Sequence, residues 1–405
     1  MMFDLICLCF VVIGVLLLIM GNINIRKNKN KISLSKQYGK KICVLIPARN
    51  ESKVIEGLLK SLKEQSIKFN MEDAYVIVES EKDKTVDICK KYDATVIVRT
   101  TTRQRKGYAL DEALKQISKK YDLYFIFDAD NILDKNYFKE MLKTYEQGYD
   151  IGIGYRNCKN GNDNVIAACS SLTFSMVNTL GNDFRNKHNA NSIISGTGFY
   201  IKGTWIKKWQ GYPFYGLTED YELSLYAILN NLTTYYNDKA IFYDEQPTKY
   251  KQTVSQRIRW IKGYFEARKK YIPLIVKDMD SKKDNYGSKY SVCLGVRAFI
   301  YIAIGIILYV FKNILYLFIG NFNQNISITK TLTFILIVLL LSYIIMMIIT
   351  YKMIKKDKLA LNRKTKIKTI FYNPIYLSTY VICALKALFI KDVKWVPIEH
   401  KVSIK

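Results

Sequence analysis

Between residues 40 and about 245 the chain alternates short apolar runs with amphipathic stretches. Four runs have the length and the β-branched or aromatic content of buried strands, at 42–46, 75–78, 95–98 and 123–127. Stretches with helical spacing follow them, at 51–65, 85–92, 109–120 and 164–180. Strands that alternate with helices predict an α/β domain with a mostly parallel, Rossmann-like sheet covered on both faces. We place this domain at residues 40–250.

An apolar segment precedes this domain. Residues 1–22 are almost wholly apolar, and basic residues follow them at 26–31. A cleaved signal peptide carries its positive charge before the apolar run. The observed order therefore predicts a retained transmembrane anchor whose basic flank lies in the cytosol.

Three further apolar segments lie within residues 291–392, at 292–310, 332–350 and 370–390. The first two approach the ~20 residues that a spanning helix needs. The third contains Asn373, Pro374 and Lys386, and the sequence leaves open whether it spans the membrane or lies at its surface. The side on which the tail, 393–405, ends is open for the same reason. The basic connector 351–368 favours a multi-pass plasma-membrane protein with its catalytic domain in the cytosol.

Residues 251–280 form a basic, aromatic stretch with helical periodicity. Basic side chains alternate there with Ile258, Trp260, Tyr264 and Phe265. This composition is typical of a helix that lies in the plane of the lipid headgroups. An ordinary surface helix is the alternative.

The chain has 62 Lys and Arg against 35 Asp and Glu, a formal net charge of +27. Such an excess favours an anionic partner such as a nucleotide or a lipid surface, and a lysine-biased composition with basic cytosolic loops explains it equally well. No zinc-finger, basic-zipper or RNA-recognition pattern occurs, so we expect no nucleic-acid partner. With only two His, and no Cys-x-x-Cys among eight Cys, a general base is expected to be a carboxylate.

Asp128 and Asp130 stand where the apolar run 123–127 gives way to a loop. In an open α/β sheet, ligands bind at the carboxyl ends of the strands. Two carboxylates at i and i+2 offer the hard oxygen ligands that Mg²⁺ or Mn²⁺ prefers. Such an ion would neutralise charge on a departing diphosphate. Asp-x-Asp alone is common, and its place after a buried run is what favours a metal site.

Glu219 and Asp220 follow a glycine-rich segment, 196–198, and precede a helical stretch. Asp220 is a candidate general base that removes a proton from an acceptor hydroxyl. The alternative is a helix N-cap, for which Thr218 and Asp220 are both suitable residue types.

Gln256, Arg259 and Trp260 occupy positions i, i+3 and i+4, so they share one face of a helix. An arginine can bind a diphosphate through two N–H groups, and a tryptophan offers a flat surface to a sugar ring. Lys106 precedes the helical stretch 109–120 and is placed to meet a phosphate at a helix N-terminus. A buried Trp in an amphipathic helix and a solvated basic loop are the alternatives.

In this combination and order the residues resemble glycosyltransferase family 2, in the membrane-embedded branch that includes synthases of cellulose, hyaluronan and poly-N-acetylglucosamine. The resemblance covers roughly residues 40–265. It rests on Val44-Leu45-Ile46-Pro47-Ala48-Arg49-Asn50-Glu51, Lys106-Gly107-Tyr108-Ala109-Leu110, Phe127-Asp128-Ala129-Asp130-Asn131, Gly196-Thr197-Gly198-Phe199, Thr218-Glu219-Asp220 and Gln256-Arg257-Ile258-Arg259-Trp260.

The resemblance implies a GT-A fold with a mixed sheet, and inverting transfer from a UDP-sugar. It implies Mg²⁺ or Mn²⁺ at Asp130 with Asp128 near the nucleotide, and Asp220 as the base with Glu219 beside it. The donor contacts that it implies are Pro47, Arg49, Glu51, Glu79, Lys106, Asp128, Asp130, Gln256, Arg259 and Trp260. The acceptor contacts that it implies are Gly196, Thr197, Gly198 and Trp260.

Glu79 departs from the family pattern, which usually has Asp in contact with the uracil or ribose at this position. The longer side chain still reaches a base. The departure makes UDP a less secure choice of donor nucleotide.

We therefore expect a β-glycosyltransferase that extends a polysaccharide at the cytosolic face of the membrane. Export of the chain through its own helices, with a partner subunit or a second copy of the chain, is compatible with this expectation. The alternative within the same chemistry is the transfer of one sugar to a lipid. The alternative of another class is a non-catalytic membrane scaffold or transport protein.

Overall fold

The computed structural model describes residues 2–26, 41–319, 324–357, 359–391 and 393. Its centre is an eight-stranded sheet in the order β3-β2-β1-β4-β7-β6-β8-β5. The strands are β1 (Ile42–Pro47), β2 (Ala74–Val78), β3 (Thr95–Val98), β4 (Leu123–Ile126), β5 (Ile132–Leu133), β6 (Ile151–Cys158), β7 (Phe199–Lys202) and β8 (Thr234–Asp244).

The sheet is mixed. The strands β1 to β4 run parallel to one another. The short strand β7 is antiparallel to both of its neighbours, β4 and β6, whereas β8 runs parallel to β6. The four strands that the apolar pattern predicts are the parallel half, because strands buried on both faces read as continuous apolar runs.

Residues along the parallel strands alternate between two cores. Val44 and Ile46 face one core, and Cys43 and Leu45 face the other. The first core is closed by α2 (Ile55–Lys63), α3 (Thr85–Lys91) and α5 (Tyr137–Glu146). The second is closed by α4 (Lys106–Gln116), α8 (Gly203–Trp209) and α9 (Glu219–Leu229). A 3₁₀ turn, η1, precedes β2 at Met71–Asp73.

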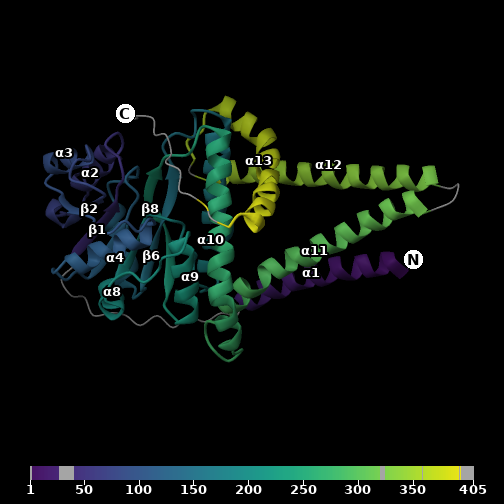
Figure 1. Cartoon of the computed structure of the whole chain (residues 1–405), viewed down its shortest axis with the longest axis horizontal. Coiled ribbons are helices and arrows are strands. Elements are labelled where there is room, and N and C mark those ends of the chain that lie inside the picture. The colour runs from purple at the N-terminus through teal and green to yellow at the C-terminus, as the bar shows by residue number, and fades with distance from the viewer. Residues whose placement is uncertain (1, 27–40, 320–323, 358, 392, 394–405) are drawn as a thin grey trace.

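The remaining helices lie outside the sheet domain. They are α1 (Met2–Arg26), α6 (Val165–Met176), the π-helical turn η2 (Val177–Asn182), α7 (Asp183–Lys187), α10 (Tyr250–Lys277), α11 (Tyr286–Ile319), α12 (Gln324–Lys356) and α13 (Arg363–Phe389). Figure 1 shows α1, α11 and α12 extending together away from the sheet domain, with α10 and α13 side by side at their base.

Helix α10 packs between α9 and α13. It buries Arg257, Gly263, Ala267 and Tyr271, while Lys269 and other basic side chains remain exposed. One face of this helix is thus used for contacts within the protein, and the prediction that it lies in the headgroup plane stays a prediction.

Two described helices are long and apolar enough to cross a membrane, Phe3–Arg26 and Leu336–Lys356. The segment expected at 292–310 is helical, within α11, but the side chains at 294–300 lie outside the described residues. The basic linker at 27–40 and the tail from 394 also lie outside them.

Candidate functional site

The donor-side candidates follow the carboxyl ends of the parallel strands. Pro47 ends β1, and Glu79 follows β2. The Nη1 atom of Arg99, after β3, lies 2.8 Å from Oε1 of Glu79. The guanidinium of Arg49 donates to Oε1 of Gln104 over 3.0 Å. These groups share the edge of the sheet where open α/β folds bind ligands.

Glu51 lies at the same edge, where the chain turns toward α2. Its backbone N–H donates to Oγ1 of Thr85 over 3.1 Å, and its carbonyl accepts from the N–H groups of Val54 and Ile55. The described contacts of Glu51 therefore shape the turn into α2.

The side chain of Thr197 fixes the loop that carries Asp128 and Asp130. The backbone N–H of Asp128 donates to Oγ1 of Thr197 over 2.8 Å, and that hydroxyl donates to Oδ1 of Asn131 over 2.5 Å. The amide of Asn131 in turn donates to Oδ1 of Asp130 over 3.1 Å. The buried Thr197 thus orients the aspartates, and its expected contact with an acceptor stays a prediction.

Glycine is required on both sides of Thr197. Gly196 and Gly198 have φ angles of +83° and +67°, a region that side chains other than glycine rarely adopt. A Cβ on Gly198 would lie 2.1 Å from the ring of Phe242. The Gly-Thr-Gly sequence therefore brings β7 and the aspartate loop into close contact.

Lys106 lies between the aspartate loop and the start of α9. Its Nζ is 2.5 Å from Oδ1 of Asp128, 2.8 Å from the carbonyl oxygen of Gly196 and 3.9 Å from Oε1 of Glu219. The next residue explains this position, because a Cβ on Gly107 would lie 1.8 Å from the carbonyl oxygen of Phe214. Only glycine there lets α4 begin against the loop that leads to α9.

Asp220 is held beside Gly196 at the start of α9. Burial raises the pKa of the Asp220 carboxyl above its usual range, against the lowering effect of the backbone N–H groups of Tyr221 and Gly196 and the charges of Lys106 and Arg259. Burial likewise raises the pKa of Glu219. Thr218, at the N-cap position, makes no side-chain capping bond. The role of Asp220 as a general base stays a prediction.

Helix α10 approaches the start of α9 closely. A Cβ on Gly263 would lie 2.6 Å from Oγ1 of Thr218. Arg259 donates from Nη1 to the carbonyl oxygen of Leu217 over 3.2 Å. The ring of Trp260 meets Phe174 of α6 edge-on, with centroids 5.8 Å apart. Gln256 lies partly buried one turn earlier on α10.

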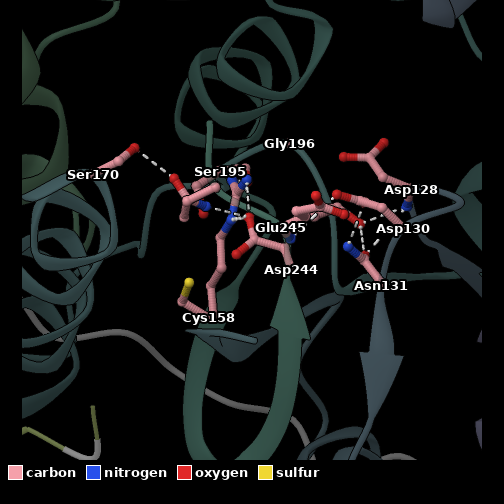
Figure 2. Close-up of polar contacts among 12 residues, drawn as sticks. Asp128, Asp130, Asn131, Cys158, Ser170, Ser195, Gly196, Asp244 and Glu245 are labelled. Atoms are coloured by element: carbon pink, nitrogen blue, oxygen red, sulfur yellow. Dashed lines mark hydrogen bonds and ion pairs between the residues drawn. The ribbon is translucent and has the colours of Figure 1, made fainter. Parts of the chain in front are cut away.

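A second group of charged residues lies behind the site, and the sequence reasoning missed it. Arg156 lies near the end of β6 and donates from Nε to Oδ2 of Asp244 over 2.5 Å and from Nη1 to the carbonyl oxygen of Ser195 over 2.8 Å. Its guanidinium also lies 3.7 Å from the centroid of Phe174. Figure 2 shows Asp244 between Ser170 and the aspartate loop. The available signal in the sequence was a charged residue directly after a short apolar run, at Arg156 and again at Asp244.

Glu245 and Lys159 extend this group to Asp130. The backbone N–H of Glu245 donates to Oδ2 of Asp130 over 3.2 Å, and Nζ of Lys159 donates to the Asp130 carbonyl oxygen over 3.0 Å. Lys159 and Glu245 lie 3.4 Å apart. Asp130 is thereby fixed by the residues that directly follow β6 and β8 as well as by Asn131, as Figure 2 shows in part.

The carboxylate oxygens at this edge of the sheet are suitable ligands for a hard divalent cation. Asp128 and Asp130 supply carboxylate oxygens, and the Asp128 side chain is 41% exposed. Within the described residues no three His, Cys, Asp or Glu side chains form a ready cage. Two carboxylates with open positions suit Mg²⁺, which commonly keeps waters and takes its other ligands from substrate phosphates.

The comparison with family models decides which family this arrangement represents. A model described as glycosyltransferase like family 2 matches residues 40–263, more than half of the chain. The chain belongs to this family. Residues 40–263 therefore form a glycosyltransferase family 2 domain, and its mixed α/β fold is GT-A-like.

Several relatives agree with this family. The probable glycosyltransferase YdaM of Bacillus subtilis is 25% identical over 232 residues, 55% of this chain and 55% of that protein. Hyaluronan synthase 2 of Xenopus laevis is 26% identical over 163 residues, 38% of this chain and 30% of that protein. The chain thus spans 55% and 30% of the length of these two curated relatives.

Among solved structures, the mannosyltransferase PcManGT from Pyrobaculum calidifontis, in complex with GDP-Man and Mn²⁺, superposes with a TM-score of 0.60. The two chains are 12% identical, and the match covers 96% of this chain and 100% of that one. At this identity the likeness supports the fold, and it extends over the helices outside the sheet domain as well.

Proposed function

We propose that the protein is an inverting β-glycosyltransferase that moves a sugar from a UDP-sugar to a growing polysaccharide at the cytosolic face of a membrane. The observation that carries the proposal is the bridge made by Lys106. One lysine contacts Asp128, of the metal-type pair, and also Glu219 and Gly196, which flank the candidate base Asp220. These contacts support a proton-accepting group that adjoins the diphosphate subsite.

In the proposed reaction, Asp220 takes the proton from the acceptor hydroxyl as its oxygen attacks the anomeric carbon of the donor. The pKa of this carboxyl is raised toward neutral pH. A general base is most effective when its pKa lies near the working pH. Attack from the face opposite to the leaving group converts an α-linked donor into a β-linked product. Glu219 lies beside the base and adds negative potential there.

The departing diphosphate is received by cationic groups. Asp128 and Asp130 would hold the divalent cation, which supplies positive charge to the leaving phosphates when bound. Arg259 lies close enough to Asp220 to lower its pKa and has a guanidinium suited to two phosphate oxygens. Fixed charges placed before the reaction lower its barrier without reorganisation.

The donor nucleotide would lie along the ends of β1, β2 and β3, near Arg49, Glu51 and Glu79. Glu79 is already oriented by Arg99, so its carboxylate is placed to accept hydrogen bonds from a base or ribose. The sugar would lie between Gly196 and Trp260, whose ring forms one wall together with Phe174.

The membrane location is part of the proposal. The two candidate spans and the likeness to part of a hyaluronan synthase support it. Helices α1 and α12 would cross the bilayer, and α13 would lie at its surface beside α10. A polymer product is favoured because the helix of the QRIRW segment adjoins these elements (Figure 1).

The proposal is tested by nucleotide release from the purified full-length protein against a panel of UDP- and GDP-sugars, with Mn²⁺, with Mg²⁺ and with EDTA. We expect metal-dependent release of UDP with one donor and a β-linked polymer in mass analysis. A product with one sugar on a lipid would contradict the polymerase, and metal-independent release or release from GDP-sugars alone would contradict the proposed donor chemistry.

A further inference from the structure

Arg257 is fully buried within the QRIRW segment of α10, with 1% of its surface exposed. Its Nη1 atom donates to the carbonyl oxygen of Tyr376 over 3.0 Å and to Oγ1 of Thr379 over 2.5 Å. Its guanidinium lies 3.7 Å and 4.1 Å from the ring centroids of Tyr376 and Tyr380. All of these partners belong to α13. The side chain therefore joins α10 to a residue of α13 that lies 119 positions later in the sequence.

Burying a cation in this place is costly, and its Nη2 atom has no hydrogen-bond partner among the described residues. An apolar side chain of similar size would fill the space without that cost. Unlike an apolar side chain, the arginine makes contacts that depend on the orientation of its guanidinium. Two hydrogen bonds and two aromatic faces fix the plane of the guanidinium, and with it the rotation of α10 about its own axis.

The residues whose orientation depends on that rotation follow at once. Arg259 and Trp260 lie two and three positions further along α10, and they contact Leu217 and Phe174 on the side of the transferase site. The close approach of Gly263 to Thr218 leaves little room for α10 to shift. Helix α10 is thus fixed by contacts with the site on one side and by contacts with α13 on the other.

Helix α13 lies outside the segment that matches the family model, which ends at residue 263. It is tied to the candidate span in α12 by a buried hydrogen bond of 2.9 Å from Nδ2 of Asn373 to Oγ1 of Thr350. A continuous set of contacts therefore runs from α12 through α13 and Arg257 to the residues of the site.

We propose that Arg257 is a positioning residue for sugar transfer, which orients Arg259 and Trp260 by fixing α10 on α13. Helix α13 thereby contributes to the geometry of the transferase site. The inference rests on the proposed function for the roles of Arg259 and Trp260, and its partners Tyr376, Thr379 and Tyr380 are the residues through which it acts.

The kinetic test compares Arg257→Met, Arg257→Lys and Thr379→Val in the full-length protein. We expect Arg257→Met to lower kcat by at least about tenfold with a smaller change in the donor KM, because a misplaced Arg259 loses contacts made chiefly in the transition state. Arg257→Lys should restore part of kcat. Because both residues act through one contact, Arg257→Met combined with Thr379→Val should be no worse than Arg257→Met alone.

Arg268→Met is the matched control. Arg268 is a partly buried arginine on the same helix that donates to the carbonyl oxygen of Val292 over 2.6 Å, on α11. We expect this variant to lower the thermal midpoint while kcat stays close to wild type. An equal loss of kcat in Arg268→Met, or an unchanged kcat in Arg257→Met, would overturn the positioning role.

A spectroscopic arm separates this inference from the proposed function. With 5-fluorotryptophan incorporated, the ¹⁹F resonance of Trp260 is assigned by its disappearance in Trp260→Phe. We expect Arg257→Met to shift that resonance and Arg268→Met to leave it in place. The reading needs no donor sugar, so a wild-type protein that releases no UDP would defeat the proposed function alone, whereas an unmoved Trp260 resonance would defeat the inference.

Discussion

Lys106 and Asp128 form an ion pair with Nζ 2.5 Å from Oδ1, which joins the first turn of α4 to the loop after β4. The same lysine reaches the carbonyl oxygen of Gly196 and the carboxylate of Glu219. The structure places Lys106 among the acidic groups of the site, and its contact with a donor phosphate stays a prediction. Its charge therefore sets the proton affinity of those groups.

The acid limb of the pH profile should respond to Lys106. Its charge lowers the pKa values of Glu219 and Asp220, which burial raises. In Lys106→Met both values rise further, and because the base must be unprotonated, activity should be lost at a higher pH as the solution is acidified. The kcat/KM profiles of wild type, Lys106→Met and Lys106→Arg measure this. A limb that stays in place or moves to lower pH in Lys106→Met would contradict it.

Removal of a metal ligand should appear as a loss of metal affinity. Asp130→Asn keeps the shape of the side chain but removes its charge, so the Mn²⁺ concentration for half-maximal transfer should rise at least about tenfold. Asn131→Ala, which removes the amide that donates to Asp130, should give a smaller rise. Titration of Mn²⁺ into EDTA-treated protein gives both values, and equal half-saturation in Asp130→Asn and wild type would exclude Asp130 as a ligand.

The contact between α10 and α9 should tolerate no larger side chain at Gly263. A Cβ there would lie 2.6 Å from Oγ1 and 2.9 Å from the backbone N of Thr218, so Gly263→Ala forces α10 away from the base. Overpacking of this kind costs about 1–3 kcal/mol of stability. We expect kcat to fall as well. Gly181→Ala is the control, because a Cβ at Gly181 has open space around it; the same effect in both variants would argue against this account.

Arg156 and Asp244 should be strongly coupled. Burial raises the pKa of Asp244, and Arg156 opposes that rise. Arg156→Met leaves a buried carboxylate without its cation, which costs about 3–5 kcal/mol. Because the folded-state pKa of Asp244 then lies further above its unfolded value, protonation favours the folded state, and the deficit should be smaller at a mildly acidic pH than at a mildly alkaline pH. Urea unfolding at both pH values measures it, and a deficit that grows on acidification would refute this reading.

The strands that the sequence predicts differ from the strand that it does not predict in how continuous their apolar pattern is. The run at 42–46 and the run at 123–127 are buried on both faces, so each reads as a strand without its neighbours. The strand β8 does not, because Asn237, Asp238 and Lys239 interrupt its apolar pattern and its pairing with β6 shifts register at Gly154/Tyr155. The Asp244 group at its end was missed for that reason.

Long-range contacts of the site were similarly out of reach. The role of Thr197 depends on its distance from Asn131, and that of Arg257 on a helix that begins more than a hundred residues later. Neither spacing leaves a periodic signal. The identity of the aspartates and of the QRIRW segment was accessible because each cluster is local, whereas the glycines at 107 and 263 show their purpose only through Phe214 and Thr218.

The central claim, that Asp220 is the base of a transfer reaction at this site, is tested most directly by Asp220→Asn. Donor binding and sugar transfer are measured on the same preparation, by calorimetric titration and by single-turnover product formation. The account predicts a donor dissociation constant within about threefold of wild type and a transfer rate lower by about 10²–10⁴-fold. Transfer at the wild-type rate in Asp220→Asn would contradict it.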